Sequence, residues 1–188
     1  AKKPRIHMIP FDPSRKMMSS IHNADGKKIV YVKGAPIEVL SKCKYILIDG
    51  VNKELSSYYK DEIISQINEF AKEGLRVLAF AYKEIPKDIH EYTIENIEKD
   101  LIFIGLMAMY DPPRPEVKEA IEKARRAGIK IIMVTGDHEL TAKSIALQTS
   151  IIKDDKCKVF TGADLDKLSD EELLEELNSD GIVFARIT

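Results

Sequence analysis

The chain has 188 residues, of which 44% are hydrophobic and 32% charged, so it can bury one sizeable core or two small ones. Its formal net charge of −2 provides no electrostatic footprint for general nucleic-acid binding, and we expect no nucleic-acid partner. The two cysteines, Cys43 and Cys157, have neither a CxxC partner nor a nearby histidine cluster, which predicts free thiols and no metal site in this chain.

Up to residue 110 the pattern predicts an α+β fold with hairpin-like, antiparallel strands. Alternating or continuous apolar residues predict strands at 27–34, 45–48, 75–85 and 101–110. A helix is expected to begin at Pro36, and a longer one at 58–74, where Ile63, Ile67 and Phe70 recur at helical spacing. The segment 88–100 is expected to be a polar excursion.

The apolar run at 101–110 is too short to cross a membrane, which takes roughly 20 residues, so it predicts a buried strand. No signal peptide is recognisable at the N-terminus. The chain begins at Ala1 without a methionine and stops at Thr188 without a terminating element. We therefore expect a piece of a longer protein.

After residue 110 strands and helices alternate, which predicts a doubly wound, parallel α/β unit. The near-continuous apolar run at 129–134 is expected to be a parallel strand covered on both faces. Further strands are expected at 157–162 and 182–185. Helices are predicted at 116–127, at 139–149 and after Ser169, which forms a capping-box pattern with Glu172.

The overall prediction is an α/β protein with two domains, 1–110 and 111–188. The prolines Pro112, Pro113 and Pro115 lie between them and stiffen the crossing, because proline fixes φ and disfavours helix before it.

Thr135, Gly136 and Asp137 follow the apolar run at 129–134, at a strand end where open α/β sheets bind ligands. Gly136 allows close approach of a ligand, and the next helix offers N–H groups to an anion. The alternative is a simple turn in which Asp137 or Thr141 caps the helix. Taken alone, the pattern leaves both open.

Lys33 and Arg76 each lie on an otherwise apolar strand face. Such cations either snorkel at the sheet edge or line a pocket for something negative. Phe11, between Pro10 and Pro13, is either a core residue or an aromatic platform that stacks a nucleobase. Met17, Met18, Met107 and Met109 are expected to be packing residues.

Six segments occur in order along the chain: FDPSRKMMS, VKGAP, GLRVLAFAY, DPPRPEV, MVTGDHELTAKSIA and FARIT. In this combination the chain resembles the P-type cation-transporting ATPases, most closely the type II branch that pumps calcium and related ions. The resemblance implies the later part of a nucleotide-binding domain at 1–110 and part of a haloacid-dehalogenase-like phosphorylation domain at 111–188. It also implies a cytoplasmic region of an integral membrane protein that uses ATP and Mg²⁺, with actuator and transmembrane domains as partners.

The family implies roles for the matching residues. A nucleotide site would be formed by Phe11 on the adenine, with Lys16, Lys33, Gly34, Arg76, Asp111, Arg114 and Arg186. Thr135, Gly136 and Asp137 would border the phosphorylated aspartate, with Thr135 holding the transferred phosphoryl group. The chain departs from the family pattern at Pro13, Ile37 and Ser150, where a nucleotide-contacting arginine, a glutamate and a glycine are usual.

Neither DKTGT, with the phosphate-accepting aspartate, nor GDGxND, with the Mg²⁺ ligands, occurs in the chain. Phosphoryl transfer depends on these groups, so we expect ATP binding without hydrolysis. The alternatives are a phosphatase sharing the haloacid-dehalogenase core and a non-catalytic nucleotide-binding or interaction module. Self-association by strand exchange is a further expectation.

Overall fold

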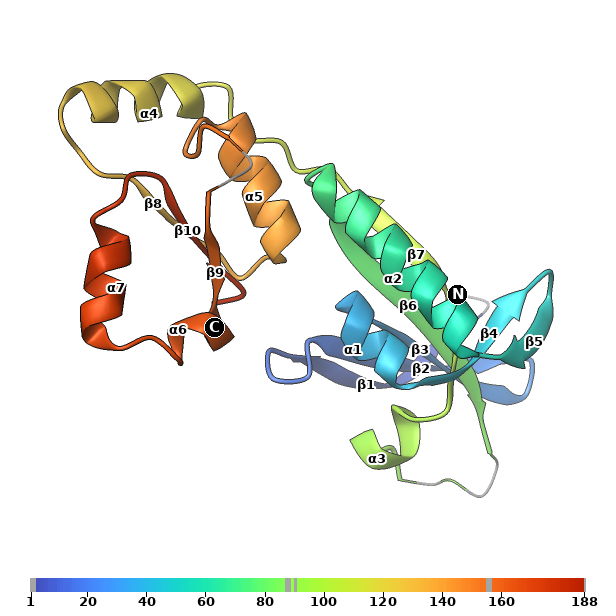
Figure 1. Cartoon of the computed structure of the whole chain (residues 1–188). Coiled ribbons are helices and arrows are strands. Elements are labelled where there is room, and N and C mark those ends of the chain that lie inside the picture. Colours follow the sequence, from blue (N-terminus) through green and yellow to red (C-terminus); the bar gives the residue numbers. More distant parts are fainter. Residues whose placement is uncertain (1–2, 87–88, 90, 155–156, 188) are drawn as a thin grey trace. The chain divides into compact units, whose positions relative to one another are not determined.

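The computed structural model describes residues 3–86, 89, 91–154 and 157–187. Its contacts divide into two compact units, each of which has its own architecture. The first comprises Ala1–Ile67 and Val77–Ala108, and the second comprises Asn68–Arg76 and Met109–Thr188. Figure 1 labels the elements of both units.

The first unit is built on a sheet that, in the described part of the chain, has seven strands in the order β1-β2-β3-β6-β7-β4-β5 (Figure 1). These strands are β1 (Arg5–Asp12), β2 (Met17–Ala24), β3 (Lys27–Gly34), β4 (Cys43–Ile48), β5 (Val51–Glu54), β6 (Arg76–Ile85) and β7 (Leu101–Met109). Four pairs are antiparallel: β1–β2, β2–β3, β3–β6 and β4–β5. Strands β4 and β7 are parallel. The predicted antiparallel pairing is therefore confirmed at β3–β6, whereas β4–β7 departs from it, and the hairpin β1–β2 is absent from the prediction.

Helices α1 (Pro36–Ser41) and α2 (Ser57–Lys72) pack on this sheet at the predicted positions. Val39 of α1 and Ile63 of α2 belong to the same buried cluster as Val30 and Val32 of β3. Because strand side chains alternate between faces, the other set on β3, including Lys33, is left on the opposite face. The candidate site described below includes Lys33 of this opposite face.

The polar segment 88–100 contains a short helix, α3 (Ile94–Ile97), that the prediction lacks. Ile97 and Glu98 at its C-terminal end are buried, with 0% and 2% of their surface exposed. A helix of four residues is too short to show hydrophobic periodicity, so only the structure reveals that this segment enters the core.

The buried thiol of Cys43 lies at the start of β4 and contacts the carbonyl oxygen of Val39 at 3.1 Å. Burial raises the pKa of this thiol to about 12. Cys43 is a free cysteine, and so is the partly exposed Cys157 in the second unit. Both free thiols agree with the prediction.

The second unit contains a parallel sheet with the strand order β8-β10-β9. Its elements are α4 (Val117–Arg126), β8 (Ile132–Val134), α5 (Glu139–Gln148), β9 (Val159–Thr161), α6 (Gly162–Leu165), α7 (Asp170–Leu177) and β10 (Ile182–Ala185). In Figure 1, α5 lies beside this sheet, and its Ala142 and Ala146 are buried together with Val183 and Ala185 of β10. The predicted capping box of Ser169 and Glu172 is present at the start of α7.

One expectation for this unit is wrong, and the helix cap considered above as an alternative is not the one observed. Strand β8 is not covered on both faces, because Ile132 and Val134 are 41% and 62% exposed at the edge of the sheet. An apolar run shows that a strand is suited to burial but does not show whether a neighbour covers it. The cap of α5 is neither Asp137 nor Thr141, since His138 Nδ1 accepts a hydrogen bond from the amide of Leu140.

Ser150, immediately after the C-cap of α5, has a φ of +63°, in the left-handed region that favours glycine. We expect Ser150→Gly to raise the free energy of unfolding of this unit by about 1 kcal/mol, because the left-handed strain is relieved. Thermal denaturation followed by circular dichroism measures the effect. Ser144→Gly within α5 is the matched control and should destabilise, as glycine does in helix interiors. A lower Tm for Ser150→Gly than for the parent chain would contradict the expectation.

Candidate functional site

A cavity of about 490 Å³ lies on the first unit and is formed by strands β1, β2, β3 and β6. Its lining residues are Arg5, Met18, Ser20, His22, Tyr31, Val32, Lys33 and Phe80. The volume falls in the range of small-molecule sites, roughly 300–1,000 Å³.

The cavity follows from strand register. Met18 on β2 pairs with Lys33 on β3, and Lys33 pairs in turn with Phe80 on β6. Directly opposed residues project from the same face of a sheet, so a thioether, an ammonium group and a phenyl ring lie in one row. Ser20 and Tyr31 form the neighbouring row. An apolar surface with a cation set into it suits a ligand that combines a flat ring with negative charge.

The β1–β2 hairpin carries two further predicted site residues, Phe11 and Lys16. Phe11 is 59% exposed, so it is not a core residue, and Lys16 Nζ lies 3.3 Å from Oε1 of Glu38. Neither Phe11 nor Lys16 is among the residues that line the cavity. Both belong to the β1–β2 hairpin, and strand β2 of this hairpin contributes Met18 to the cavity.

Gly34 follows Lys33 and is buried where the backbone of β3 meets the start of β2. A Cβ atom at this position would lie 2.5 Å from the carbonyl oxygen of Lys16 and 2.5 Å from Cβ of Met17. The described structure therefore explains Gly34 by close packing under the hairpin, and not by direct exposure to a ligand.

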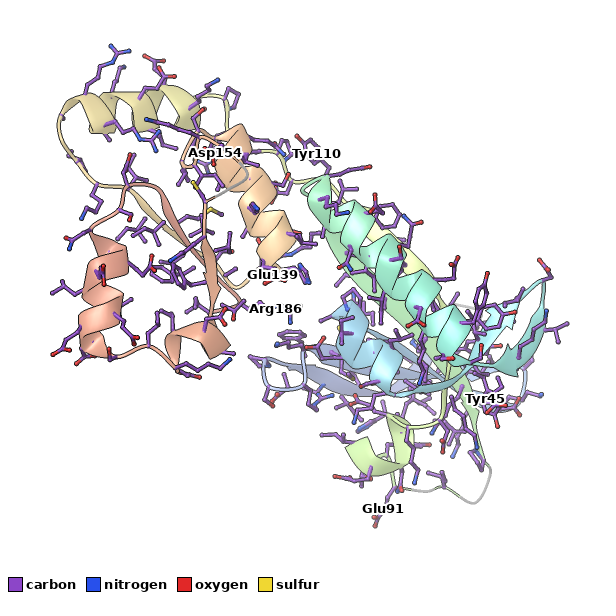
Figure 2. The ribbon with its side chains drawn as sticks, in the orientation of Figure 1. Tyr45, Glu91, Tyr110, Glu139, Asp154 and Arg186 are labelled. Atoms are coloured by element: carbon purple, nitrogen blue, oxygen red, sulfur yellow. The ribbon has the colours of Figure 1, made fainter. Side chains whose placement is uncertain are left out.

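The second unit gathers four other predicted residues at the carboxyl end of its sheet. Thr135, Gly136 and Asp137 follow β8, and Arg186 follows β10. The amide of Arg186 donates to the carbonyl of Asp137 at 3.0 Å, and the Thr135 hydroxyl accepts from the amide of Asp137 at 3.1 Å. Figure 2 labels Arg186 at this end, near Glu139 at the start of α5.

Gly136 has no structural reason to be glycine within the described chain. Its φ is not in the left-handed region, and a Cβ atom would meet only the carbonyl oxygen of Ile187, at an ordinary contact distance of 3.4 Å. The residue is exposed.

The other predicted residues lie elsewhere. Arg76, the first residue of β6, is grouped with the second unit; its Nη2 lies 2.7 Å from Oδ1 of Asp137, and it does not line the cavity. Asp111 and Arg114 are exposed in the segment before α4.

Met18, Ser20 and His22 line the cavity but are not predicted site residues. Met18 was expected to pack in the core, and only its neighbour Met17 does so, with 2% exposed. The signal is alternation on β2, where Met17, Ser19 and Ile21 are buried and the residues between them are half-exposed. Because β2 is absent from the prediction, this alternation does not identify Met18 as a cavity residue.

Among residues 3–86, 89, 91–154 and 157–187, no group of three or more His, Cys, Asp or Glu side chains could hold a metal ion. Within the same described residues, no helix is long and apolar enough to cross a membrane.

Comparison with known proteins identifies relatives over nearly the whole chain. Residues 1–116 match the family model for the P-type ATPase, cytoplasmic domain N. The chain is 41% identical to calcium-transporting ATPase 1 of Lactococcus lactis, with 100% of this chain and 21% of that protein covered. It is 40% identical to calcium-transporting ATPase 1 of Bacillus cereus, where the coverage is 98% and 20%. It is also 40% identical to the sodium/potassium-transporting ATPase subunit alpha-A of Artemia franciscana, where the coverage is 82% and 16%. The chain therefore spans about a fifth of the length of the curated relatives it matches.

Proposed function

The chain belongs to the P-type ATPases, and from this premise we propose that its first unit binds ATP at the cavity of Lys33 and Phe80. In the whole protein, this ATP would phosphorylate an aspartate outside these residues and drive the transport of a cation across a membrane. Calcium is the first candidate, because it is the ion named for several of the relatives.

The observation that carries the proposal is the row Met18–Lys33–Phe80 in a unit that matches a nucleotide-binding domain of this family. The apolar side chains suit the faces of a purine, and the ammonium of Lys33 suits a phosphate. Phe11, at 59% exposure on the adjoining hairpin, would stack on the adenine, and Lys16 would add charge beside it.

We propose that the second unit is part of a haloacid-dehalogenase-like phosphorylation domain. The parallel order β8-β10-β9 and the hydrogen bond from Arg186 to Asp137 at its carboxyl end support this role. The Thr135 hydroxyl and the Gly136 amide would donate to a phosphoryl group, and Asp137 would lie beside it. Asp111 and Arg114 would act at the hinge before α4, and Arg76 and Arg186 would approach the phosphates.

Mg²⁺ would accompany the phosphates of ATP, where it neutralises charge during phosphoryl transfer. The described residues do not fit a metal site of their own, since no cluster of three ligand side chains occurs among them. We therefore assign the Mg²⁺ ligands, like the phosphorylated aspartate, to parts of the protein outside this chain, and expect the chain to bind ATP without hydrolysing it.

The test is a titration of the 188-residue chain with ATP, followed by isothermal calorimetry and by NMR shifts of the cavity residues. We expect Lys33→Met to weaken ATP binding about tenfold, because one charged contact to phosphate is lost while the apolar stem remains. The loss should shrink at high salt, which screens exposed charges.

The matched control is Lys53→Met on β5, an exposed lysine at the far edge of the same sheet. It changes the net charge by the same amount, so it should leave ATP affinity near the parent value if the effect is local. Equal affinity in the parent chain and in Lys33→Met, or shifts that map away from β2, β3 and β6, would overturn the site.

A further inference from the structure

A buried carboxylate lies behind the hairpin turn that carries Phe11 and Lys16. Glu98, at the C-terminal end of α3, has 1% of its side chain exposed. Its two carboxylate oxygens each lie 2.6 Å from Nη1 of Arg15, and the Ser19 hydroxyl donates to Oε1 at 2.5 Å. All of these groups belong to the first unit.

Arg15 also reaches the backbone next to Phe11. Its Nη2 donates to the carbonyl oxygen of Pro10 at 2.9 Å while Nη1 holds Glu98. The guanidinium is planar and presents its donors in a fixed fork, so it sets the distance and direction between the two acceptors. The Arg15 side chain thus ties the residue before Phe11 to a buried carboxylate that is 83 positions from Arg15 in sequence.

The turn between Phe11 and Lys16 is closed by its own hydrogen bonds. Asp12 Oδ1 accepts from the amides of Ser14 and Arg15 at 2.8 and 3.1 Å, and the amide of Lys16 donates to the carbonyl of Asp12 at 2.7 Å. The Ser14 hydroxyl bond, followed by these amide bonds, lowers the pKa of Asp12. These hydrogen bonds hold the turn in one conformation. The link from Arg15 to Glu98 attaches the turn to the interior of the unit.

Stability alone does not account for this ion pair. A buried pair loses so much hydration that an apolar replacement of similar volume is often as stable. The pair fixes the orientation of the β1–β2 turn. This orientation matters because Phe11 is 59% exposed and has little packing of its own. Its place is set by the backbone that Arg15 holds.

We propose that Arg15 and Glu98 are positioning residues that hold the Phe11 platform and Lys16 in place for a nucleotide. This inference rests on the proposed function. It assigns to α3, whose C-cap residue Glu98 accepts hydrogen bonds from Arg15 and Ser19, the role of an anchor for the ligand-binding turn.

The experiment uses Phe11→Trp as a reporter, because the chain contains no tryptophan and the new ring is the single emitter. Arg15→Lys and Glu98→Gln are introduced into this background. Lysine still neutralises Glu98 but cannot span both Glu98 and the Pro10 carbonyl. We expect Arg15→Lys to lower the tryptophan anisotropy and to weaken ATP binding about three- to tenfold, as loss of a charged hydrogen bond predicts. Glu98→Gln should do the same, with a lower Tm.

Ile63→Val in α2 is the control, since it removes one methyl group from the same buried cluster at a position outside the hairpin. It should lower the Tm but leave anisotropy and ATP affinity at the parent values. Unchanged anisotropy and affinity in Arg15→Lys would overturn the anchor while leaving the ATP site intact. If Phe11→Ala does not weaken ATP binding, the platform itself fails, and the anisotropy of the reporter still decides whether Arg15 and Glu98 hold the turn.

Discussion

Replacing Phe11 by alanine should weaken ATP binding by the chain about 10- to 100-fold, because stacking of a base on an aromatic ring contributes about 1–3 kcal/mol. The ring is 59% exposed, so its removal leaves little cavity in the core and the Tm should stay near the parent value. Calorimetric titration with ATP and thermal denaturation of the same sample measure both quantities.

Two comparisons make the Phe11→Ala result specific. Tripolyphosphate carries the charge of ATP without the ring, so its affinity should be the same for the parent chain and the variant. Tyr58→Ala removes another exposed aromatic ring, 65% exposed on α2, and should leave ATP affinity unchanged. Equal ATP affinity in Phe11→Ala and the parent, or binding in neither, would reject the platform.

The elements with clear periodicity were predictable from the sequence. Helix α2 was recognisable because Ile63 and Ile67 recur one turn apart, and both are buried. The β4–β5 turn holds Asp49 and Gly50, a residue pair typical of tight hairpins, and their φ values of 51° and 77° are those that such a turn demands. In these cases the local preference and the tertiary structure agree.

The rest depends on contacts between residues far apart in sequence. Prolines and charges around Phe11 conceal β1 and β2, and only the structure shows that β2 pairs with β1 on one side and with β3 on the other. The role of Glu98 is concealed further, because a glutamate in a polar segment predicts a solvated face. Its burial depends on Arg15, 83 positions earlier, and a single sequence does not reveal that pairing.

The candidate site shows the same limit. Alternation puts Lys33 on an otherwise apolar strand face, and register then brings it directly opposite Phe80. Arg76 has the same alternation, yet it is grouped with the second unit and does not line the cavity. Strand faces are predictable from a period of two, whereas the position along the strand at which a cavity ends is not.

Gly34→Ala should lower the free energy of unfolding of the first unit by about 3 kcal/mol, at the upper end of the effects of overpacking. The new Cβ atom would lie 2.5 Å from both the Lys16 carbonyl oxygen and Met17 Cβ, and these atoms cannot rotate away as the end of a long side chain can. The amide of Ala35 donates to that same carbonyl at 2.9 Å, so relief of the clash displaces the hairpin. Chemical denaturation followed by circular dichroism measures the loss.

Gly105→Ala is the matched control, since it makes the same substitution in β7 of the same sheet. Its φ is not in the left-handed region and a Cβ atom there would meet nothing within 4 Å, so alanine should be neutral or stabilise by about 0.5 kcal/mol by restricting the unfolded chain. Opposite signs at the two positions would show that close packing under the β1–β2 hairpin, and not the general preference of strands against glycine, requires Gly34. Equal stability of the two variants would contradict this explanation.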